Sequence, residues 1–428
     1  MTSKTQTIKS QQNGFNLFSI ATVIMMLFYI LPQAVIFVRN DVMAIIVTVY
    51  YMLFISKYVP INDVLKSLLI AVPYLVLYWL NNFPGSFRLG FVLPLITLWT
   101  LVMPCFAIIA VVKRNNPDEQ KVIIIATSIC LLYVFISTFR GLAIDPLIMR
   151  EMAGSEDIAV HIARMKGVGG YGFAYAVGAL FIASWLIYKF IKHSLYLKLL
   201  MIVIIIACGV LIVQSQYATL LFISIFGVAI YYFITANTLG KKFRVVVIAL
   251  IAIFASQTLV IIGTSLFGGD VLRYKFTLIY DAIWGNAGVE NISGDRSQLQ
   301  LDAFDLFLSS PIWGYSGAVN LEEYSEAHSS IMSVMVSTGL IGIVSFFMLF
   351  YSSCKKLLAG TPQRINDSKF YYPILIYYFL FALLNPVEYA FECAWMIFFV
   401  VPLLFVFLIN KIKFNIYESE KHHPPFRT

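Results

Sequence analysis

The residues best suited to chemistry lie close together in one stretch of the chain. Arg296 opens a segment with the pattern of a short amphipathic helix, which ends at Pro311-Ile-Trp-Gly314. His328 stands just before the next apolar run, in which glycines recur as Gly339-Leu-Ile-Gly342. A guanidinium can bind a diphosphate through two parallel hydrogen bonds, and an imidazole titrates near neutral pH and can transfer a proton. The stretch therefore combines anion binding with acid–base chemistry.

A structural role is the alternative for each of these side chains. His328 can cap the helix that follows it, and Arg140 can anchor the end of a membrane span by snorkelling. A purely structural role explains Arg296 less well, because a cation in the first turn of a helix opposes the helix dipole. Glu388 and Glu392 flank a turn between two apolar runs. Acids at such depth are often functional, but a short exposed turn explains these two equally well.

Apolar residues dominate the composition and indicate the elements that position these side chains. Of the 428 residues, 60% are hydrophobic and 12% are charged, whereas soluble domains carry roughly 25% charged residues. The apolar residues fall in blocks of about 17–25, the length at which a helix crosses a bilayer. Continuous runs such as 201–213 lack the alternation of barrel strands. The five cysteines show no paired loop spacing, so neither a disulfide framework nor a zinc site is indicated.

We therefore predict an all-α fold, a polytopic transmembrane helix bundle in which residues 1–428 form a single membrane domain. Gly339 and Gly342 are expected to let their helix pack closely against a neighbour. No metal and no cofactor is expected. The 12 predicted spans are 15–38, 41–57, 64–80, 89–112, 122–139, 171–191, 197–213, 218–236, 245–266, 331–352, 370–387 and 391–410.

Lysine and arginine set the expected orientation. With a cytoplasmic N-terminus, 21 of the 30 basic residues fall on the inner side, and both termini lie inside. The net charge of +8 then reflects topology and anionic lipid, and nucleic acid is not an expected partner. Two long loops, 140–170 and 267–330, fall outside, and each is predicted to contain a short amphipathic helix. One places His161 on a solvated face, and the other starts at Asp295 as N-cap and stops at Pro311.

The order of these elements resembles the bacterial O-antigen polymerase and O-antigen ligase superfamily. The resemblance rests on Arg296, the amphipathic helix, Pro311-x-x-Gly314-x-x-Gly317 and His328-Ser329 ahead of the glycine repeat. The layout of about 12 spans is similar too. The resemblance implies a metal-independent glycosyltransferase of the GT-C type, which takes a glycan from undecaprenyl pyrophosphate. Arg296 and His328 then match the catalytic positions of the family motif, and Tyr315 lies inside it as a candidate for binding the glycan.

The sequence departs from the family at one position. Many relatives carry a Ser-Arg pair in the middle of the chain, where this sequence has Ser215-Gln216. Gln216 is therefore a candidate for substrate binding in place of an arginine. If the missing arginine normally holds the diphosphate, an arginine of the outer loops must replace it. The sequence does not choose among Arg140, Arg150, Arg164 and Arg273.

The resemblance implies a polymerase that joins lipid-linked repeat units into surface polysaccharide, O-antigen or capsule, at the periplasmic face of the bacterial inner membrane. Its partners would be an undecaprenyl-pyrophosphate-linked donor and acceptor, membrane lipid and a chain-length regulator protein. An O-antigen ligase, which moves the finished glycan to lipid A–core, is the alternative within the same chemistry. A flippase or transporter of lipid-linked sugars is the alternative from another class. The near absence of Lys and Arg from span interiors favours an outer-face enzyme over a translocation path.

Overall fold

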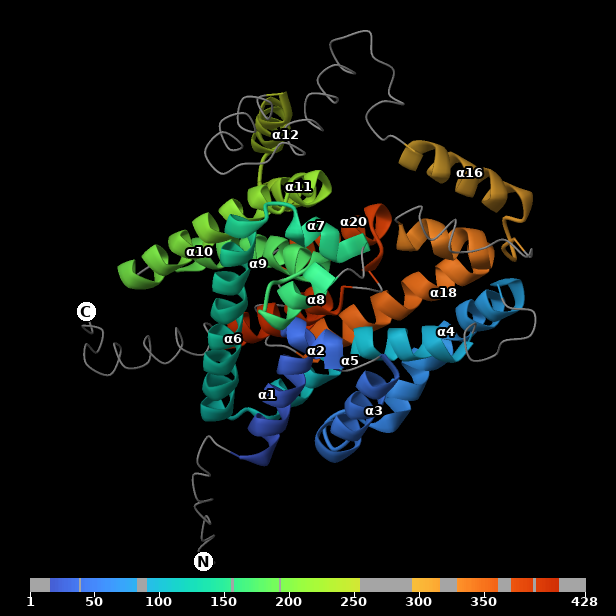
Figure 1. Ribbon diagram of the computed structural model, residues 1–428, viewed down its shortest axis with the longest axis horizontal. Coiled ribbons are helices and arrows are strands. Elements are labelled where there is room, and N and C mark those ends of the chain that lie inside the picture. The colour runs from blue at the N-terminus through green and yellow to red at the C-terminus, as the bar shows by residue number, and fades with distance from the viewer. Residues whose placement is uncertain are drawn as a thin grey trace, which may run out of the picture.

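The computed structural model describes residues 16–37, 40–82, 91–154, 158–191, 194–254, 295–315, 329–360, 371–387 and 390–407. Within these ranges all regular structure is helical and no strand occurs. The helices pack as a bundle in which the last elements, coloured red, lie among the others, while the first element lies at the lower edge of the view (Figure 1). The predicted all-α class is therefore confirmed.

The first half of the chain forms a series of long helices joined by short turns. They are α1 (Leu17–Ile30), α2 (Pro32–Phe37), α3 (Asn40–Tyr50) with the π-helical continuation η1 (Tyr51–Ile55), α4 (Ile61–Asn82), α5 (Leu93–Arg114) and α6 (Pro117–Ile144). Two short helices follow, α7 (Ile148–Gly154) and α8 (Ile158–Met165).

The second half contains a further run of apolar helices and one polar helix. They are α9 (Tyr171–Phe190), α10 (Leu195–Gln214), α11 (Ala218–Thr235), α12 (Leu239–Phe254), the polar α16 (Asp295–Ser309), α18 (Ser330–Gly360), α20 (Tyr372–Leu384) and α21 (Phe391–Trp395) with its π-helical continuation η4 (Met396–Val400).

Among the described residues, seven helices are long and apolar enough to cross a membrane. They are α4, α5, α6, α9, α10, α11 and α18. Shorter apolar helices cover 17–30, 42–55, 372–384 and 391–407, and α12 covers part of the predicted span 245–266. The chain thus has the helices of a membrane protein. The number of 12 spans stays a prediction, because a helix under about 17 residues does not cross the hydrocarbon layer unaided.

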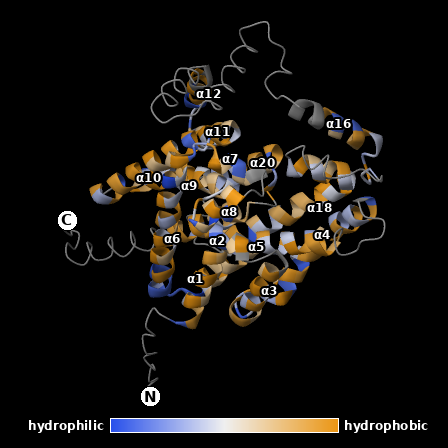
Figure 2. Cartoon of the chain, viewed as in Figure 1, coloured by the Kyte–Doolittle hydropathy of each residue, from blue (hydrophilic) through white to orange (hydrophobic). Residues whose placement is uncertain are grey.

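The core lies around α5 and α9, which are buried over most of their length, while α10 exposes most of its residues. Hydrophobic residues cover outward-facing helices such as α3 and α10 (Figure 2). Small residues let α9 sit close to its neighbours: a Cβ on Gly178 would lie 2.3 Å from the Tyr377 hydroxyl, which donates to the Tyr175 carbonyl at 2.7 Å. An apolar exterior around a tightly packed interior is the arrangement expected in lipid.

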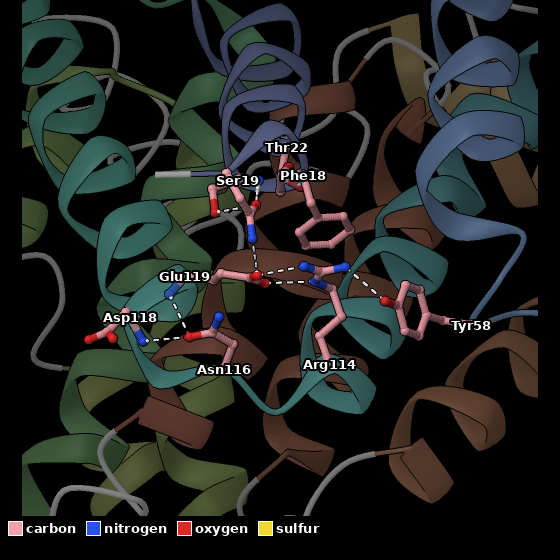
Figure 3. A network of polar contacts seen from close by, with 9 residues as sticks. Phe18, Ser19, Thr22, Tyr58, Arg114, Asn116, Asp118 and Glu119 are labelled. Carbon is pink, nitrogen blue, oxygen red and sulfur yellow. Dashed lines mark hydrogen bonds and ion pairs between the residues drawn. The ribbon is translucent and has the colours of Figure 1, made fainter. Parts of the chain in front are cut away.

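One end of the bundle is closed by a polar network (Figure 3). Arg114 binds Glu119 through two hydrogen bonds, Nε to Oε2 at 2.7 Å and Nη2 to Oε1 at 2.5 Å. Arg114 also donates to the Tyr58 hydroxyl at 2.7 Å and stacks 4.3 Å from the ring centre of Phe18. The Asn16 amide completes the network on Glu119. The charge pattern assigns all of these residues to the cytoplasmic side, so segments predicted to share a side do meet.

Replacing Glu119 with glutamine is expected to destabilise the fold. The carboxylate is nearly buried, and its loss leaves the guanidinium of Arg114 without its charged partner, at a cost of ~1–3 kcal/mol in the free energy of unfolding. Asp118→Asn is the matched control, because it removes the same charge from an exposed neighbour. Thermal unfolding in detergent should show a lower apparent Tm for E119Q than for D118N. Equal values would contradict a stabilising role of the network.

Candidate functional site

The centre of the candidate site is a break in α18. Gly339 has φ 61° and ψ −163°, which interrupts the helix between its first turns and the long remainder. The turn after α16 lies across this break. The Leu340 amide donates to the Pro311 carbonyl at 2.8 Å, and the Tyr315 amide donates to the Val336 carbonyl at 2.8 Å. The break therefore finds its hydrogen-bond partners in the turn, as a backbone shielded from water requires.

Glycine is needed on both sides of this contact. Gly314 has φ +85°, and a Cβ there would lie 2.6 Å from the backbone of Ser337. A Cβ on Gly339 would lie 2.5 Å from the backbone of Ile312. Both glycines thus combine left-handed backbone conformation with backbone-to-backbone packing. Gly339 does allow close packing as expected, but the neighbour is the turn after α16, and Gly339 breaks its own helix to receive that turn.

Asn81, near the end of α4, forms hydrogen bonds to both sides of this contact. Its buried side-chain amide donates to the Trp313 carbonyl at 2.7 Å and to the Ser337 carbonyl at 2.8 Å. The side-chain amide of Asn81 therefore donates one hydrogen bond to each of the two chain segments that meet at the break. The sequence reasoning missed this residue. The available signal was an amide pair, Asn81-Asn82, at the end of an otherwise apolar span.

A helix, α16, lies where the amphipathic helix before the turn was predicted; it ends ahead of Pro311, and Asp295, predicted as its N-cap, is its first helical residue. Its apolar stripe packs on the first part of α18, where Ala303 and Phe307 are buried with Val336. The two helices start at the same end and run side by side toward the break (Figure 1). Arg296 lies in the first turn of α16.

The start of α18 is fixed to the end of α20. The Ser329 hydroxyl donates to the Leu383 carbonyl at 2.6 Å and accepts from the Met332 amide at 3.2 Å, as a helix cap. Ser330 accepts from the Val387 amide at 2.7 Å, and its own amide donates to the Asn385 carbonyl at 3.3 Å. His328 itself lies outside the described residues, as does Arg273. The chain directly after His328 is thus held against the turn that follows α20.

The helix α6 continues to Ile144, so Arg140, at the start of the predicted first outer loop, lies within a helix and is exposed. Arg150 on α7 and Arg164 on α8 are both half-buried, and Arg164 donates to the Met152 carbonyl at 3.0 Å. His161 lies on a short helix, α8, and is exposed.

Gln216 and its neighbour connect this loop to the turn between α10 and α11. Gln216 is buried in left-handed conformation, φ 56°, and its amide donates to the Pro146 carbonyl at 3.2 Å. The Tyr217 hydroxyl donates to the Met149 carbonyl at 2.7 Å. The Gln216 side chain thus helps to hold the loop. Tyr315 is half-buried against the cluster between α16 and α18.

Glu392, the second residue of α21, is half-buried. Its Oε2 lies where a Cβ on Gly172 would come within 2.1 Å, so the carboxylate sits against the first turn of α9. Ala390, just ahead of it, donates to the Val387 carbonyl at 3.0 Å. Asn385 and Val387 therefore contact the start of α18, and Val387 is linked to Ala390 just ahead of Glu392, whereas Glu388 and Tyr389 lie outside the described residues.

The segment after α6, the turn before α11 and the turn after α20 meet around Tyr171. Tyr171 links the parts: its hydroxyl donates to the Pro386 carbonyl at 3.5 Å, and its ring packs on Tyr217 with centroids 5.8 Å apart. In the part of the chain that is described, no group of His, Cys, Asp and Glu side chains is arranged to hold a metal ion.

The chain was compared with protein-family models, with curated proteins and with solved structures, and none of the three comparisons found a match.

Replacing Gly339 with alanine is expected to disrupt the contact at the break. The left-handed conformation alone costs about 1–3 kcal/mol for a residue with a Cβ, and the Cβ would also meet the backbone of Ile312. Gly240→Ala is the control, because a Cβ at Gly240 meets nothing within 4 Å. Tryptophan fluorescence during heating in detergent should show a lower apparent Tm for G339A alone. A G339A protein as stable as G240A would mean that the contact is not as described.

Proposed function

We propose that this chain is a glycosyltransferase that joins undecaprenyl-pyrophosphate-linked repeat units into surface polysaccharide. The observation that carries the proposal is the meeting of the two halves of the sequence motif. The Pro311–Gly314 turn docks on the Gly339 break, and α16 and α18 start at the same end. Arg296 belongs to the first turn of α16, and His328 directly precedes the described start of α18.

The proposed chemistry follows from the charge of the leaving group. Transfer of the glycan releases a lipid diphosphate, on which negative charge develops in the transition state. Arg296 binds that diphosphate bidentately. The half-buried Arg150 and Arg164 offer further positive charge at the outer end. His328 supplies a group that can donate or accept a hydrogen bond at the reacting oxygens.

The proposed orientation places this end of the bundle in the periplasm and the Arg114–Glu119 network in the cytoplasm. The support is the charge pattern together with contacts between segments assigned to the same side. Asn16, Tyr58 and Glu119 meet at one end, and Gln33 donates to the Tyr133 hydroxyl at 2.8 Å toward the other. The protein would then lie in the bacterial inner membrane with both termini inside.

A transporter is the second candidate, and the broken helix α18 is the observation in its favour. In transporters, the free backbone groups of such a break face the substrate. Here the Leu340 amide donates to the Pro311 carbonyl and the Ile341 amide donates to the Ile312 carbonyl. The Asn81 side chain donates to the Ser337 carbonyl. The break is therefore occupied by the protein's own chain, which favours the enzyme.

Deleting the gene separates the candidates by the glycan that remains. The proposed polymerase predicts loss of the polysaccharide ladder on a gel while single repeats stay attached to their carrier. Long chains that remain on the undecaprenyl lipid and are not transferred to lipid A–core would indicate the ligase. Intracellular accumulation of lipid-linked single repeats would indicate a flippase, and an unchanged ladder would contradict all three.

In the deletion strain, His328→Ala and Arg296→Ala variants are each expected to restore little or no polymer. Loss of one catalytic group typically lowers a rate by about 10²–10⁴-fold. His161→Ala, at an exposed position of α8, is the control and should restore a normal ladder. Gel analysis should be paired with immunoblots of membrane fractions, which should show equal abundance. Normal ladders from both H328A and R296A would refute this site.

A further inference from the structure

We infer that α16 and the turn after it are inserted into the lipid of one leaflet, so that the helix lies where protein, water and hydrocarbon meet. The leaflet is the one at the end of the bundle opposite the Arg114–Glu119 network. This placement requires only that the chain spans a membrane, whatever reaction it carries out. Three observations support it: three distinct faces on α16, a continuous exposed apolar surface, and the depth of the turn.

The side chains of α16 from Leu301 onward form three faces. One face, with Ala303 and Phe307, is buried against α18. The other two each repeat at the helical spacing i, i+3, i+7: the polar face consists of Asp302, Asp305 and Ser309, and the exposed apolar face consists of Leu301, Phe304 and Leu308. Because they are offset by one residue, these two faces lie roughly 100° apart around the helix. An amphipathic helix on a water-facing protein needs one apolar face, and α16 has a second that the protein does not bury.

The exposed apolar face of α16 continues onto the lipid-facing surface of the bundle. Ile312 and Trp313 extend it past the end of the helix, and the five apolar side chains of α16 and its turn are 42–61% exposed. The Ile312 carbonyl accepts from the Ile341 amide of α18, which brings the turn beside Leu340. From there an exposed apolar stripe runs along α18, a candidate membrane span, through Leu340, Val344, Met348 and Tyr351. Lipid tails that cover this stripe therefore also reach α16, which lies at the margin of the bundle (Figure 1).

The depth of the turn can be counted along two helices. On α18, sixteen residues separate Leu340 from Lys356, roughly 24 Å of helix. On α4, eighteen residues separate Asp63 from Asn81, roughly 27 Å. The same contacts bound both counts, because Lys356 donates to the Asp63 carbonyl at 2.5 Å and Asn81 donates to the Trp313 carbonyl at 2.7 Å.

Lys356 marks the boundary of the hydrocarbon at the near end. An ammonium group is costly inside the bilayer and reaches for the interface, and α4 begins just after Tyr58 of the Arg114–Glu119 network. Since the hydrocarbon core is about 30 Å thick, the turn lies roughly 3–6 Å inside its far boundary. Any tilt of α4 and α18 from the membrane normal places the turn deeper.

The turn has the chemistry that this depth requires. Backbone groups in hydrocarbon must be bonded within the protein, and the turn meets this through the Asn81 side chain and through the amides of Leu340 and Tyr315. Trp313 is the most exposed side chain of the surface, and tryptophan is enriched at the level where hydrocarbon meets headgroups.

The test compares neighbouring positions of α16 in the full-length protein in liposomes. Single cysteines, Phe304→Cys, Asp305→Cys, Leu308→Cys and Ser309→Cys, carry a fluorophore whose emission shifts to the blue in apolar surroundings. Iodide quenches the fluorophore from water, and a phospholipid with a nitroxide near its headgroup quenches it from the bilayer. Wild-type protein treated with the same reagent gives the background, because its native cysteines are buried or half-buried.

We expect blue-shifted emission at F304C and L308C, with lipid quenching several-fold stronger than at D305C and S309C. Iodide should quench the latter two. A nitroxide near the end of the lipid chain should quench F304C and L308C less than the one near the headgroup, because the turn lies close to the boundary. Each pair compares two faces at one level of the helix, so either pair decides if a variant of the other does not accumulate.

Three results would overturn the inference. Iodide quenching at all four positions would place α16 in water. Protection of F304C and L308C from both quenchers would mean that protein, such as a second copy of the chain, covers this face. Lipid quenching at all four positions would contradict a separate polar face. None of these results depends on glycan transfer, so the placement of α16 and the proposed function fail independently.

Discussion

The backbone contact between the Pro311–Tyr315 turn and the break in α18 is the interaction on which the candidate site depends. Inside a membrane protein, a helix can be interrupted only where other groups satisfy the freed amides and carbonyls. Here the partners come from a turn that precedes the break in sequence by more than 20 residues, and from Asn81 of α4. The contact fixes the end of α16 on α18, so both helices begin at the same end of the bundle.

The rest of the bundle separates two polar ends with an apolar middle. At one end Arg114, Glu119 and Tyr58 tie together the turns of the first helices. At the other, backbone carbonyls of the first outer loop accept from Gln216, Tyr217 and Arg164. Between them, small residues and aromatic rings pack α9 against its neighbours. The first of the two predicted outer loops is therefore positioned by hydrogen bonds to its backbone carbonyls.

Much of the fold could be predicted from the sequence, because apolar blocks and charged turns follow directly from the physics of lipid. The amphipathic helices α8 and α16 were predicted for the same reason, since their apolar faces recur at helical spacing. The helix break at Gly339 was not predicted, because a glycine that breaks a helix and a glycine that packs against a helix look alike in sequence. Asn81 and Glu392 were missed or left open for a related reason. A polar residue at the end of a span has many possible partners, and only the tertiary structure supplies the partner.

The central claim is that lipid-linked glycan binds where α16 and α18 begin. Photo-crosslinking tests it most directly: a lipid-linked repeat with a photoreactive group beside the diphosphate is irradiated with the full-length protein in membranes, and labelled peptides are identified by mass spectrometry. The account predicts labels on peptides that contain Arg296, the start of α18 or the turn before Glu392, and competition by unlabelled repeat. Labels confined to the opposite end, around Arg114 and Glu119, would contradict it.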